Sequence, residues 1–287
     1  MKFGIVYAYW SKDWEGDYID TIRRAKRCGF DVLEIFTPLL LGYTSIELDE
    51  LKEAALEEGV ELAFLVGLGK CHDLSSASPT IRREGIEYVK KILNVIHYLG
   101  GKCFSGINYC AWSDFDGEID KPRRRANSIA SVKELSKTAE EYGISYNLEV
   151  TNRFEQFILN TSREAVDFVF EVNSPNVNIL LDAFHMIIEE DSIEEAIKLA
   201  GNKLGHFHCG TNNRKPPQPG LMNWEQVANG LRAIGYDGIV TLEPLVRTGG
   251  TVATDSKVWR DMTDGADDAK MDKDAECGLA FMKTLLM

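Results

Sequence analysis

One local pattern recurs along this chain and limits its fold more than any other feature: a helix-like stretch stops at a glycine, and an apolar, strand-like run follows at once. Gly29, for example, stands between residues 18–28, which have the pattern of a helix, and the apolar run 32–36. A glycine just past a helix accepts the left-handed cap conformation, so each junction predicts a helix end that leads into a strand. The same junction returns at Gly59, Gly100 with Gly101, Gly143, Gly201 and Gly235.

Helix starts and strands carry signals of their own. A Ser or Thr followed three residues later by Glu predicts a capping box, and continuous apolar runs are typical of parallel strands covered on both faces. The capping pairs are Thr44 with Glu47, Thr161 with Glu164, and Ser192 with Glu195. The predicted strands span residues 3–7, 32–36, 61–67, 102–108, 145–150, 177–183, 203–209 and 238–244.

This alternation predicts an α/β protein built as a closed (β/α)8 TIM barrel, folded as a single domain over residues 1–287. The alternative is an open, doubly wound sheet, which often carries the glycine pattern GxGxxG after its first strand. This chain has Ala8-Tyr9-Trp10-Ser11 at that point. The absence of the glycine pattern favours the closed barrel.

Charge and composition argue against several classes of partner. A net charge of −13 and a pI near 4.9 oppose binding to nucleic-acid phosphates, which require a positive surface. No apolar run approaches the roughly 20 residues of a membrane span, and the chain starts without a signal-peptide pattern. We therefore expect a cytoplasmic protein with no membrane or nucleic-acid partner. Its six cysteines contain no CxxC pair, and we expect them to stay reduced.

Four consecutive apolar runs end on a side chain able to bind a metal ion: Glu149, Asp182, His208 and Glu243. An ionised carboxylate in a dry core is costly unless it is paired or bound to a cation. The carboxyl ends of barrel strands meet at one mouth. Each residue taken singly has an alternative role as a salt-bridged core residue. Together, three carboxylates and one imidazole predict a site for a hard divalent cation such as Mn²⁺, Mg²⁺ or Co²⁺.

Two more polar residues lie in apolar runs. Glu34 interrupts VLEIF but is remote in sequence from the other four, so we expect it to make a structural hydrogen bond. His206 precedes His208 by two residues and therefore points to the same side of its strand. We expect His206 to lie one layer deeper, as a hydrogen-bonded core histidine.

The loops after these strands supply a second polar group. Glu155, His185 and Arg214 each follow one of the candidate metal ligands by a few residues. An acid, an imidazole and a guanidinium can hold adjacent oxygens of a small polyol; ordinary surface positions on polar loops are the alternative. Downstream, KPPQPG at residues 215–220 predicts a stiff loop, and the aspartate-rich residues 264–275 predict a solvated helix start.

Aromatic residues complete the candidate site. Trp10, Trp14 and Trp112 follow the first and fourth predicted strands. They are candidates for the apolar wall of a sugar pocket, with ordinary packing as the alternative.

Several long motifs give the chain a family resemblance over nearly its whole length. They are YAYW at 7–10, LEVTNRFE at 148–155, LLDAFHMIIEEDS at 180–192, GHFHCGTNNRK at 205–215, LEP at 242–244 and GGTVATDSKVWRD at 249–261. With these motifs the sequence resembles the ketose 3-epimerases of the D-tagatose 3-epimerase and D-psicose (allulose) 3-epimerase type, which have a xylose-isomerase-like TIM barrel.

The resemblance implies an isomerase of carbohydrate metabolism that epimerises free ketoses at carbon 3, such as D-fructose and D-psicose, D-tagatose and D-sorbose, or related ketopentoses. It implies that Glu149, Asp182, His208 and Glu243 bind the divalent ion, Mn²⁺ first and Co²⁺ or Mg²⁺ as alternatives. It further implies a homodimer or a homotetramer. Glu155, His185 and Arg214 then hold the substrate's carbonyl end, with Trp14 and Trp112 as further substrate contacts.

The implied chemistry assigns opposite faces of one intermediate to two acids. Glu149 and Glu243 would flank a planar cis-enediolate, one removing the proton from carbon 3 and the other returning a proton from the far side. This chain departs from the common family pattern at four places that bear on sugar preference: Thr211, Val6, Gly69-Lys70 and Leu245.

Three rival functions stay open at this point. Hydroxypyruvate isomerase and inosose dehydratase resemble this ligand set on a similar barrel. A metal-dependent endonuclease of abasic DNA uses a related barrel, but the acidic charge and the five histidines of this chain disfavour it. A non-catalytic sugar-binding protein is the third.

Overall fold

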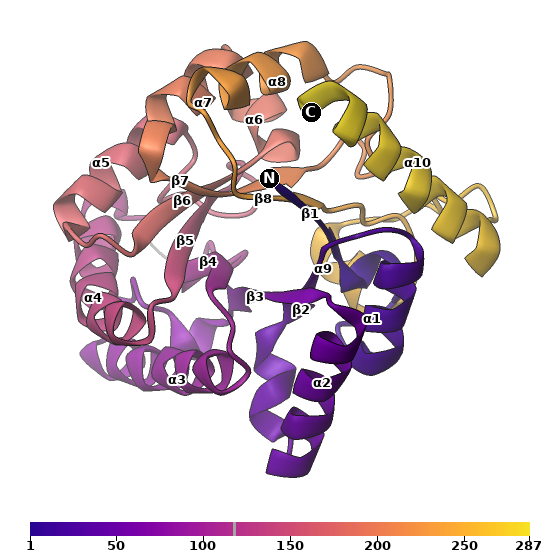
Figure 1. Cartoon of the computed structure of the whole chain (residues 1–287). Coiled ribbons are helices and arrows are strands. Elements are labelled where there is room, and N and C mark those ends of the chain that lie inside the picture. Colours follow the sequence, from indigo (N-terminus) through magenta and orange to yellow (C-terminus); the bar gives the residue numbers. More distant parts are fainter. Residues whose placement is uncertain (117–118) are drawn as a thin grey trace.

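The computed structural model describes residues 1–116 and 119–287. Its centre is a closed barrel of eight parallel strands in sequence order, in which β1 pairs with β2 on one side and with β8 on the other (Figure 1). The closed barrel is therefore confirmed, and the open sheet is excluded. The strands are β1 (Lys2–Val6), β2 (Val32–Phe36), β3 (Glu61–Leu68), β4 (Cys103–Ala111), β5 (Ser145–Val150), β6 (Val177–Asp182), β7 (Leu204–Cys209) and β8 (Ile239–Leu242).

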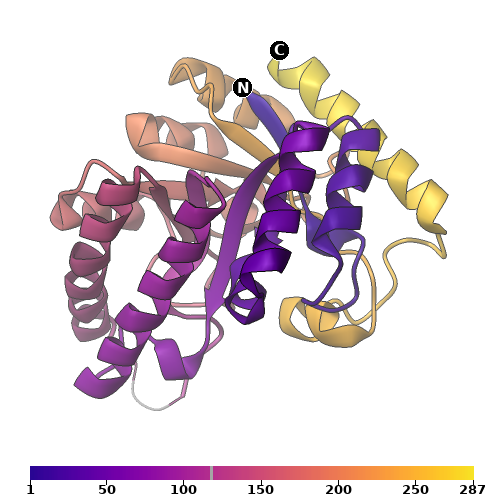
Figure 2. The same ribbon diagram turned by 60° about the horizontal axis from the view of Figure 1, so that its bottom comes forward.

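Helices surround this barrel and connect its strands (Figures 1 and 2). The α-helices are α1 (Tyr18–Arg27), α2 (Ser45–Glu58), α3 (Pro79–Tyr98), α4 (Lys121–Tyr142), α5 (Ser162–Val172), α6 (Ala183–Glu189), α7 (Ile193–Ala200), α8 (Trp224–Ala233), α9 (Gly250–Ser256) and α10 (Asp268–Leu286). Short 3-10 turns are η1 (Tyr7–Tyr9), η2 (Thr37–Gly42), η3 (Lys70–His72) and η4 (Gly201–Lys203).

The C-terminal helix α10 links the two ends of this ring. The ring centroids of Trp224 on α8 and Phe281 on α10 lie 6.0 Å apart. On the other side, Nε of Arg24 on α1 is 2.6 Å from the carboxylate of Asp272 on α10. Helix α10 thus packs against α8 and α1, as the yellow ribbon of Figure 1 shows.

The predicted helix boundaries rest on real cap contacts. The backbone φ angle is positive at each of the six predicted junctions, for example 62° at Gly59, which is the C-cap of α2. Thr44 and Glu47 form the full reciprocal capping box of α2. The side-chain hydroxyls of Thr161 and Ser192 accept the backbone N–H groups of Glu164 and Glu195, as predicted. The two glutamate side chains bond to other partners than the cap residue's backbone N–H. Glu164 accepts from the backbone N–H of Asn160, and Glu195 pairs with Lys198.

Apolar side chains cover the wall of the barrel, and polar side chains lie along its axis. All nine residues of β4 are buried, as expected for a strand covered on both faces. Five polar side chains from five different strands are fully buried inside: Glu34, Ser105, Asn147, His206 and Thr241. A polar interior of this kind is stable only where its groups bond to one another. This layer lies beneath the carboxyl ends of the strands and forms the floor of the site described below.

Among the described residues, no helix combines the length and the apolar character that crossing a bilayer requires.

Gly205 provides a test of how tightly this interior is packed. It lies at the register shift between β6 and β7, where Ile179 pairs with Leu204 and Leu180 pairs with His206. A Cβ atom at Gly205 would lie 2.1 Å from Oδ1 of Asn147. We expect Gly205→Ala to lower the free energy of unfolding by about 1–3 kcal/mol, because the interior has no space for the added methyl group. Denaturant unfolding measures this loss.

Gly42→Ala is the matched control for that experiment. Gly42 has no atom within 4 Å of an added Cβ. We expect this variant to unfold within about 0.5 kcal/mol of the wild type. Equal losses for the two variants would contradict the packing described here.

Candidate metal and catalytic site

The four side chains predicted to bind a cation meet at the carboxyl end of the barrel. Glu149 lies on β5, Asp182 ends β6, His208 lies on β7, and Glu243 directly follows β8. Each is at most 7% exposed. One potential ligand atom from each residue lies within 4.8 Å of the others. Parallel strands bring residues far apart in sequence to one mouth, and this is the geometry that the sequence predicted.

Asp182 shows how the local backbone orients one of these carboxylates. It is the N-cap of α6, and its Oδ1 accepts the backbone N–H groups of Phe184, at 3.0 Å, and Gly210, at 3.1 Å. With Oδ1 held by the backbone, Oδ2 is the atom that lies toward the site, 3.4 Å from the Arg214 guanidinium.

The donor set fits a hard divalent cation. Burial raises the pKa of Glu149 and that of Asp182, so positive charge is needed beside them to keep both carboxylates ionised. Within the described part of the chain, Nδ1 of His208 is buried without a hydrogen-bond partner, and it lies 3.5 Å from the Glu243 carboxylate. An unpaired imidazole nitrogen among three carboxylates is a ligand set suited to Mg²⁺, Mn²⁺ or a related ion. The cluster is therefore a buried group of side chains that could hold a divalent metal ion.

Arg214 contributes positive charge from the loop after β7. Its Nη1 lies 2.8 Å from Oε2 of Glu243, and its Nη2 lies 3.4 Å from Oε1 of Glu155. The guanidinium also lies over the ring of Phe184, 3.7 Å from its centroid. Burial alone would lower the pKa of Arg214, but Glu243, Glu155 and Asp182 outweigh burial and raise it. Arg214 therefore stays charged and connects the metal cluster with the loop residue Glu155.

Charge also sets the protonation of Glu243 and His208. Burial raises the pKa of Glu243, yet His208 and Arg214 outweigh that effect and lower it to about 2. Burial lowers the pKa of His208, whereas Glu34 and Glu243 raise it well above its ordinary value. The environment of both residues thus favours an ionised carboxylate beside a positive charge, which a proton or a metal cation can supply.

His185 and Glu155 adjoin the cluster, as predicted. Nε2 of His185 lies 3.5 Å from Oε1 of Glu149, and its Nδ1 lies 3.9 Å from Oε1 of Glu155. His185 lies on α6 and not in a loop as predicted, because α6 begins directly after β6. Asn152 connects it to Glu155: the backbone N–H of Asn152 is 3.2 Å from Nδ1 of His185, and its side-chain amide donates to Glu155 at 3.2 Å. Asn152 was not among the residues predicted for the site, although it lies within the LEVTNRFE motif and follows the end of β5 by two residues.

Aromatic side chains form one wall of the cavity above the cluster. Trp14 and Trp112 both line it, with ring centroids 6.0 Å apart, and Nε1 of Trp112 donates to Glu155 at 3.0 Å. The cavity is also lined by Phe36, Leu65, Val66, Gly67, Ile107, Leu245 and Ser256. Trp10 is different: it is buried beneath the guanidinium of Arg24 and does not line this cavity. For Trp10 the packing alternative is correct.

The four places where this chain departs from the common family pattern differ in whether they line this cavity. Leu245 lines it directly, and Gly69 lines an adjoining hollow that shares Trp14 and Trp112. Val6 and Thr211 are buried elsewhere and line neither of these hollows. Only Leu245 and Gly69 therefore bear directly on the shape of the pocket.

Glu34 and His206 lie inside the barrel beneath the metal cluster. Oε2 of Glu34 is 3.0 Å from Nε2 of His208, which confirms the hydrogen bond expected for Glu34. His206 makes two bonds of 2.8 Å, from Nδ1 to the Ser105 hydroxyl and from Nε2 to the Thr241 hydroxyl. Burial lowers the pKa of His206 to about 4. His206 is the neutral, hydrogen-bonded core histidine that the sequence predicted.

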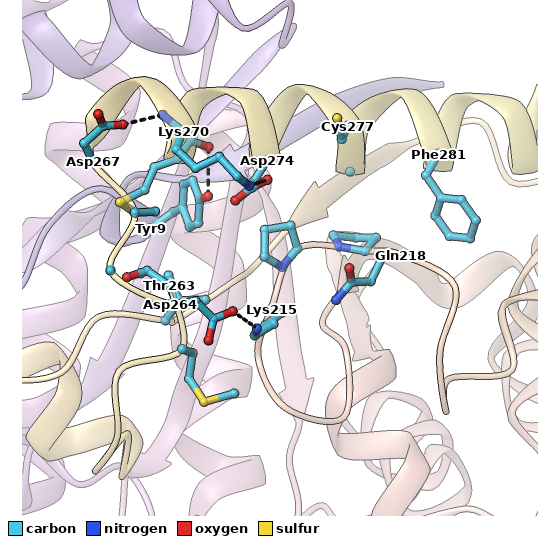
Figure 3. Close-up of a pocket in the computed structure, with 18 of the residues that line it drawn as sticks. Tyr9, Lys215, Gln218, Thr263, Asp264, Asp267, Lys270, Asp274, Cys277 and Phe281 are labelled. Atoms are coloured by element: carbon cyan, nitrogen blue, oxygen red, sulfur yellow. Dashed lines mark hydrogen bonds and ion pairs between the residues drawn. The ribbon is translucent and has the colours of Figure 1, made fainter.

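A larger hollow of about 660 Å³ lies apart from this site, between α10 and the proline-rich loop 215–220 (Figure 3). Lys215 reaches Asp264 across it at 2.9 Å, and the Tyr9 hydroxyl donates to the backbone carbonyl of Met271 on α10. The described residues that line it include none of the four metal-cluster side chains. The proline-rich loop therefore forms a wall of this outer hollow and not of the catalytic cavity.

Comparison with known proteins identifies similar chains over the full length. Residues 22–268 match the family described as xylose isomerase-like TIM barrel. The D-psicose 3-epimerase of Ruminiclostridium cellulolyticum is 42% identical over 287 residues, which cover 100% of this chain and 98% of that protein. The D-psicose 3-epimerase of Agrobacterium fabrum is 39% identical and covers 100% of this chain and 99% of its own.

A solved structure agrees with these sequence matches. The crystal structure of D-psicose 3-epimerase with D-tagatose from Clostridium cellulolyticum H10 superimposes with a TM-score of 0.98 at 42% identity. The superposition covers 100% of this chain and 99% of the other. The similarity therefore includes the whole barrel and every loop that carries a site residue.

Arg214 allows the electrostatics of the cluster to be tested without substrate. We expect Arg214→Met to lower the free energy of unfolding of the metal-free protein by about 3 kcal/mol at neutral pH, because it leaves buried carboxylates uncompensated. Without Arg214, the pKa of Glu243 rises from about 2. The difference in free energy of unfolding between wild type and Arg214→Met should therefore be largest at neutral pH. It should narrow as the pH falls through the raised pKa of Glu243 in the variant. Denaturant unfolding across a pH series measures it.

Arg83→Met is the control, because Arg83 pairs with Glu134 at the surface with 60% of its side chain exposed. We expect it to cost less than about 1 kcal/mol, with little dependence on pH. A pH-independent loss in Arg214→Met would contradict the charge balance described here.

Proposed function

Because this chain belongs to the ketose 3-epimerase family of xylose isomerase-like TIM barrels, we propose that it is a metal-dependent isomerase that inverts carbon 3 of free ketoses. The substrate class follows from its relatives, whose names specify D-psicose and, for one structure, bound D-tagatose. D-Fructose and D-psicose, D-tagatose and D-sorbose, and related ketopentoses are the proposed pairs.

The observation that carries this proposal is the placement of Glu149 and Glu243. Both are buried at the base of one cavity, and both belong to the cluster whose ligand atoms lie within 4.8 Å of one another. Inversion at a carbon next to a carbonyl requires proton removal from one face and proton delivery to the other. Two carboxylates from β5 and from the end of β8 are suited to those two tasks.

We assign the divalent ion to Glu149, Asp182, His208 and Glu243, with Mn²⁺ as the first choice and Co²⁺ or Mg²⁺ as alternatives. When bound, a divalent cation polarises the ketose carbonyl and stabilises the negative charge that develops as the proton leaves. The oxygen-rich donor set supports ions of this class over thiophilic ones.

The protonation states favour the two-acid assignment. His208 and Arg214 lower the pKa of Glu243 against the opposing effect of burial, so Glu243 is ionised and ready to accept a proton. Burial raises the pKa of Glu149, and the hydrogen bond from His185 offsets part of that rise. A base with a raised pKa is the stronger proton acceptor once it is ionised. The two carboxylates exchange roles in the reverse direction, with a planar cis-enediolate between them.

The surrounding residues bind and orient the sugar. We propose that Glu155, His185 and Arg214 hold the oxygens at the carbonyl end, since all three line the cavity beside the cluster. Trp14 and Trp112 supply an apolar face against which the carbon chain packs and from which water is excluded. Leu245, on the same lining, contributes to the choice of ketose. We also propose that the protein forms a homodimer or a homotetramer.

Two other functions predict different products. A hydroxypyruvate isomerase or an inosose dehydratase would yield an aldose-type product or lose water, whereas carbon 3 epimerisation converts one ketose into another. A sugar-binding protein would give no product at all. Product analysis by NMR therefore separates all three.

The decisive experiment is isotope exchange. We expect the Mn²⁺-loaded protein in heavy water to exchange the hydrogen on carbon 3 of D-fructose, D-psicose or D-tagatose for deuterium, because proton removal is the proposed chemical step. NMR of the recovered sugars measures the exchange, and relative kcat/KM values across the panel identify the preferred sugar. A chelator should abolish the exchange, and Mn²⁺ should restore it. No exchange with any ketose would refute the proposed function.

Single-acid variants test the two-face assignment. We expect Glu149→Gln and Glu243→Gln each to slow epimerisation by about 10²–10⁴-fold, the usual contribution of one general acid or base. Each variant retains one carboxylate. It should therefore still exchange deuterium into the one epimer whose hydrogen faces that carboxylate, without inverting it. Exchange into both epimers by either variant would show that one carboxylate serves both faces.

A further inference from the structure

A buried carboxylate from the opposite side of the barrel contacts the histidine of the metal cluster. Glu34 lies on β2, is fully buried and interrupts an apolar strand. Its Oε2 is 3.0 Å from Nε2 of His208 on β7. A carboxylate is costly to bury in a barrel interior unless a specific partner compensates it. His208 is the partner in direct hydrogen-bond contact.

This contact determines which nitrogen of His208 is available. An ionised carboxylate can only accept a hydrogen bond, so Nε2 must carry a proton that it donates to Glu34. Nδ1 is then the nitrogen that can offer a lone pair. Nδ1 has no hydrogen-bond partner within the described ranges, and it lies on the side of Glu243, 3.5 Å from that carboxylate. The Nε2 edge of the ring is thus bound to Glu34, while the Nδ1 edge is open to the metal cluster.

Glu34, His206 and His208 are also close enough together to suggest a second metal site. The hydrogen bonds argue against it. Both ring nitrogens of His206 are engaged by hydroxyl groups, Ser105 at one and Thr241 at the other, each at 2.8 Å. His206 therefore has no free nitrogen for an ion, and Glu34 acts toward His208 as a hydrogen-bond acceptor.

We propose that Glu34 is a positioning residue for the metal site: it fixes the ring orientation of His208 and presents Nδ1 to the divalent ion. This inference rests on the proposed metal site and adds a residue outside its four ligands. Carboxylates that accept a hydrogen bond from a ligating histidine commonly tune metal affinity, and their loss costs about 10–100-fold.

The test is retention of Mn²⁺ against a competing chelator. Mn²⁺-loaded wild type, Glu34→Gln and Glu34→Asp are titrated with chelator, and bound Mn²⁺ is quantified by EPR. We expect both variants to bind Mn²⁺ about 10–100-fold more weakly than the wild type. Glu34→Gln removes the charge and lets the amide donate to Nε2. Glu34→Asp keeps the charge but withdraws the carboxylate from the ring. If one variant does not fold, the Mn²⁺ affinity of the other variant tests the inference.

Ser105→Ala is the matched control in the same buried layer. Ser105 bonds to His206 but makes no hydrogen bond to Glu34 or His208. A purely structural role for the layer would make Ser105→Ala and the Glu34 variants alike: less stable, with unchanged Mn²⁺ affinity for the folded protein. We expect weakened affinity only in the Glu34 variants. Affinity within twofold of wild type in a folded Glu34 variant overturns the inference, whereas a wild type that binds no Mn²⁺ overturns the proposed metal site itself.

Discussion

The structure depends on the compensation of negative charge that is buried at the carboxyl end of the barrel. Three carboxylates, Glu149, Asp182 and Glu243, are buried together, and such a group is stable only with positive charge among its members. His208 and Arg214 supply part of it from the protein. A divalent cation bound here would supply more, and under the proposed function it would do so at the point where a ketose must lose and regain a proton. The same side chains would then meet both the requirement for charge balance and the requirement for catalysis.

The barrel makes this arrangement possible because its strands run parallel in sequence order. Residues from β5, β6, β7 and the end of β8 are adjacent at one mouth although they are far apart in the chain. Beneath them, Glu34 and His206 fill the axis with hydrogen-bonded polar groups. The floor therefore holds His208 by a hydrogen bond, while Glu155 in the loop after β5, His185 on α6 and Arg214 in the loop after β7 line the cavity above it.

The fold and the metal cluster could be predicted from sequence because their signals are local and repeated. Gly59 ends α2 by its left-handed backbone, and the Thr44–Glu47 capping box starts that helix by local hydrogen bonds. Glu149 within an apolar strand has few stable explanations. Contacts between a loop and a helix that are distant in sequence leave no such signal. Asn152 joins His185 to Glu155 through hydrogen bonds that no spacing predicts. Trp10 and Trp14 looked equivalent as loop tryptophans, yet one packs under Arg24 and the other faces the cavity, a difference that only tertiary packing determines.

In the proposed reaction, Glu149 and Glu243 flank carbon 3 of a ketose, and both would bind one divalent ion together with Asp182 and His208. Anomalous diffraction at the manganese absorption edge, from crystals grown with Mn²⁺ and D-psicose, tests it most directly. We expect a single anomalous peak bounded by those four side chains, with the two glutamates on opposite faces of carbon 3. An absent peak at this position, or a sugar with both glutamates on the same face, would contradict it.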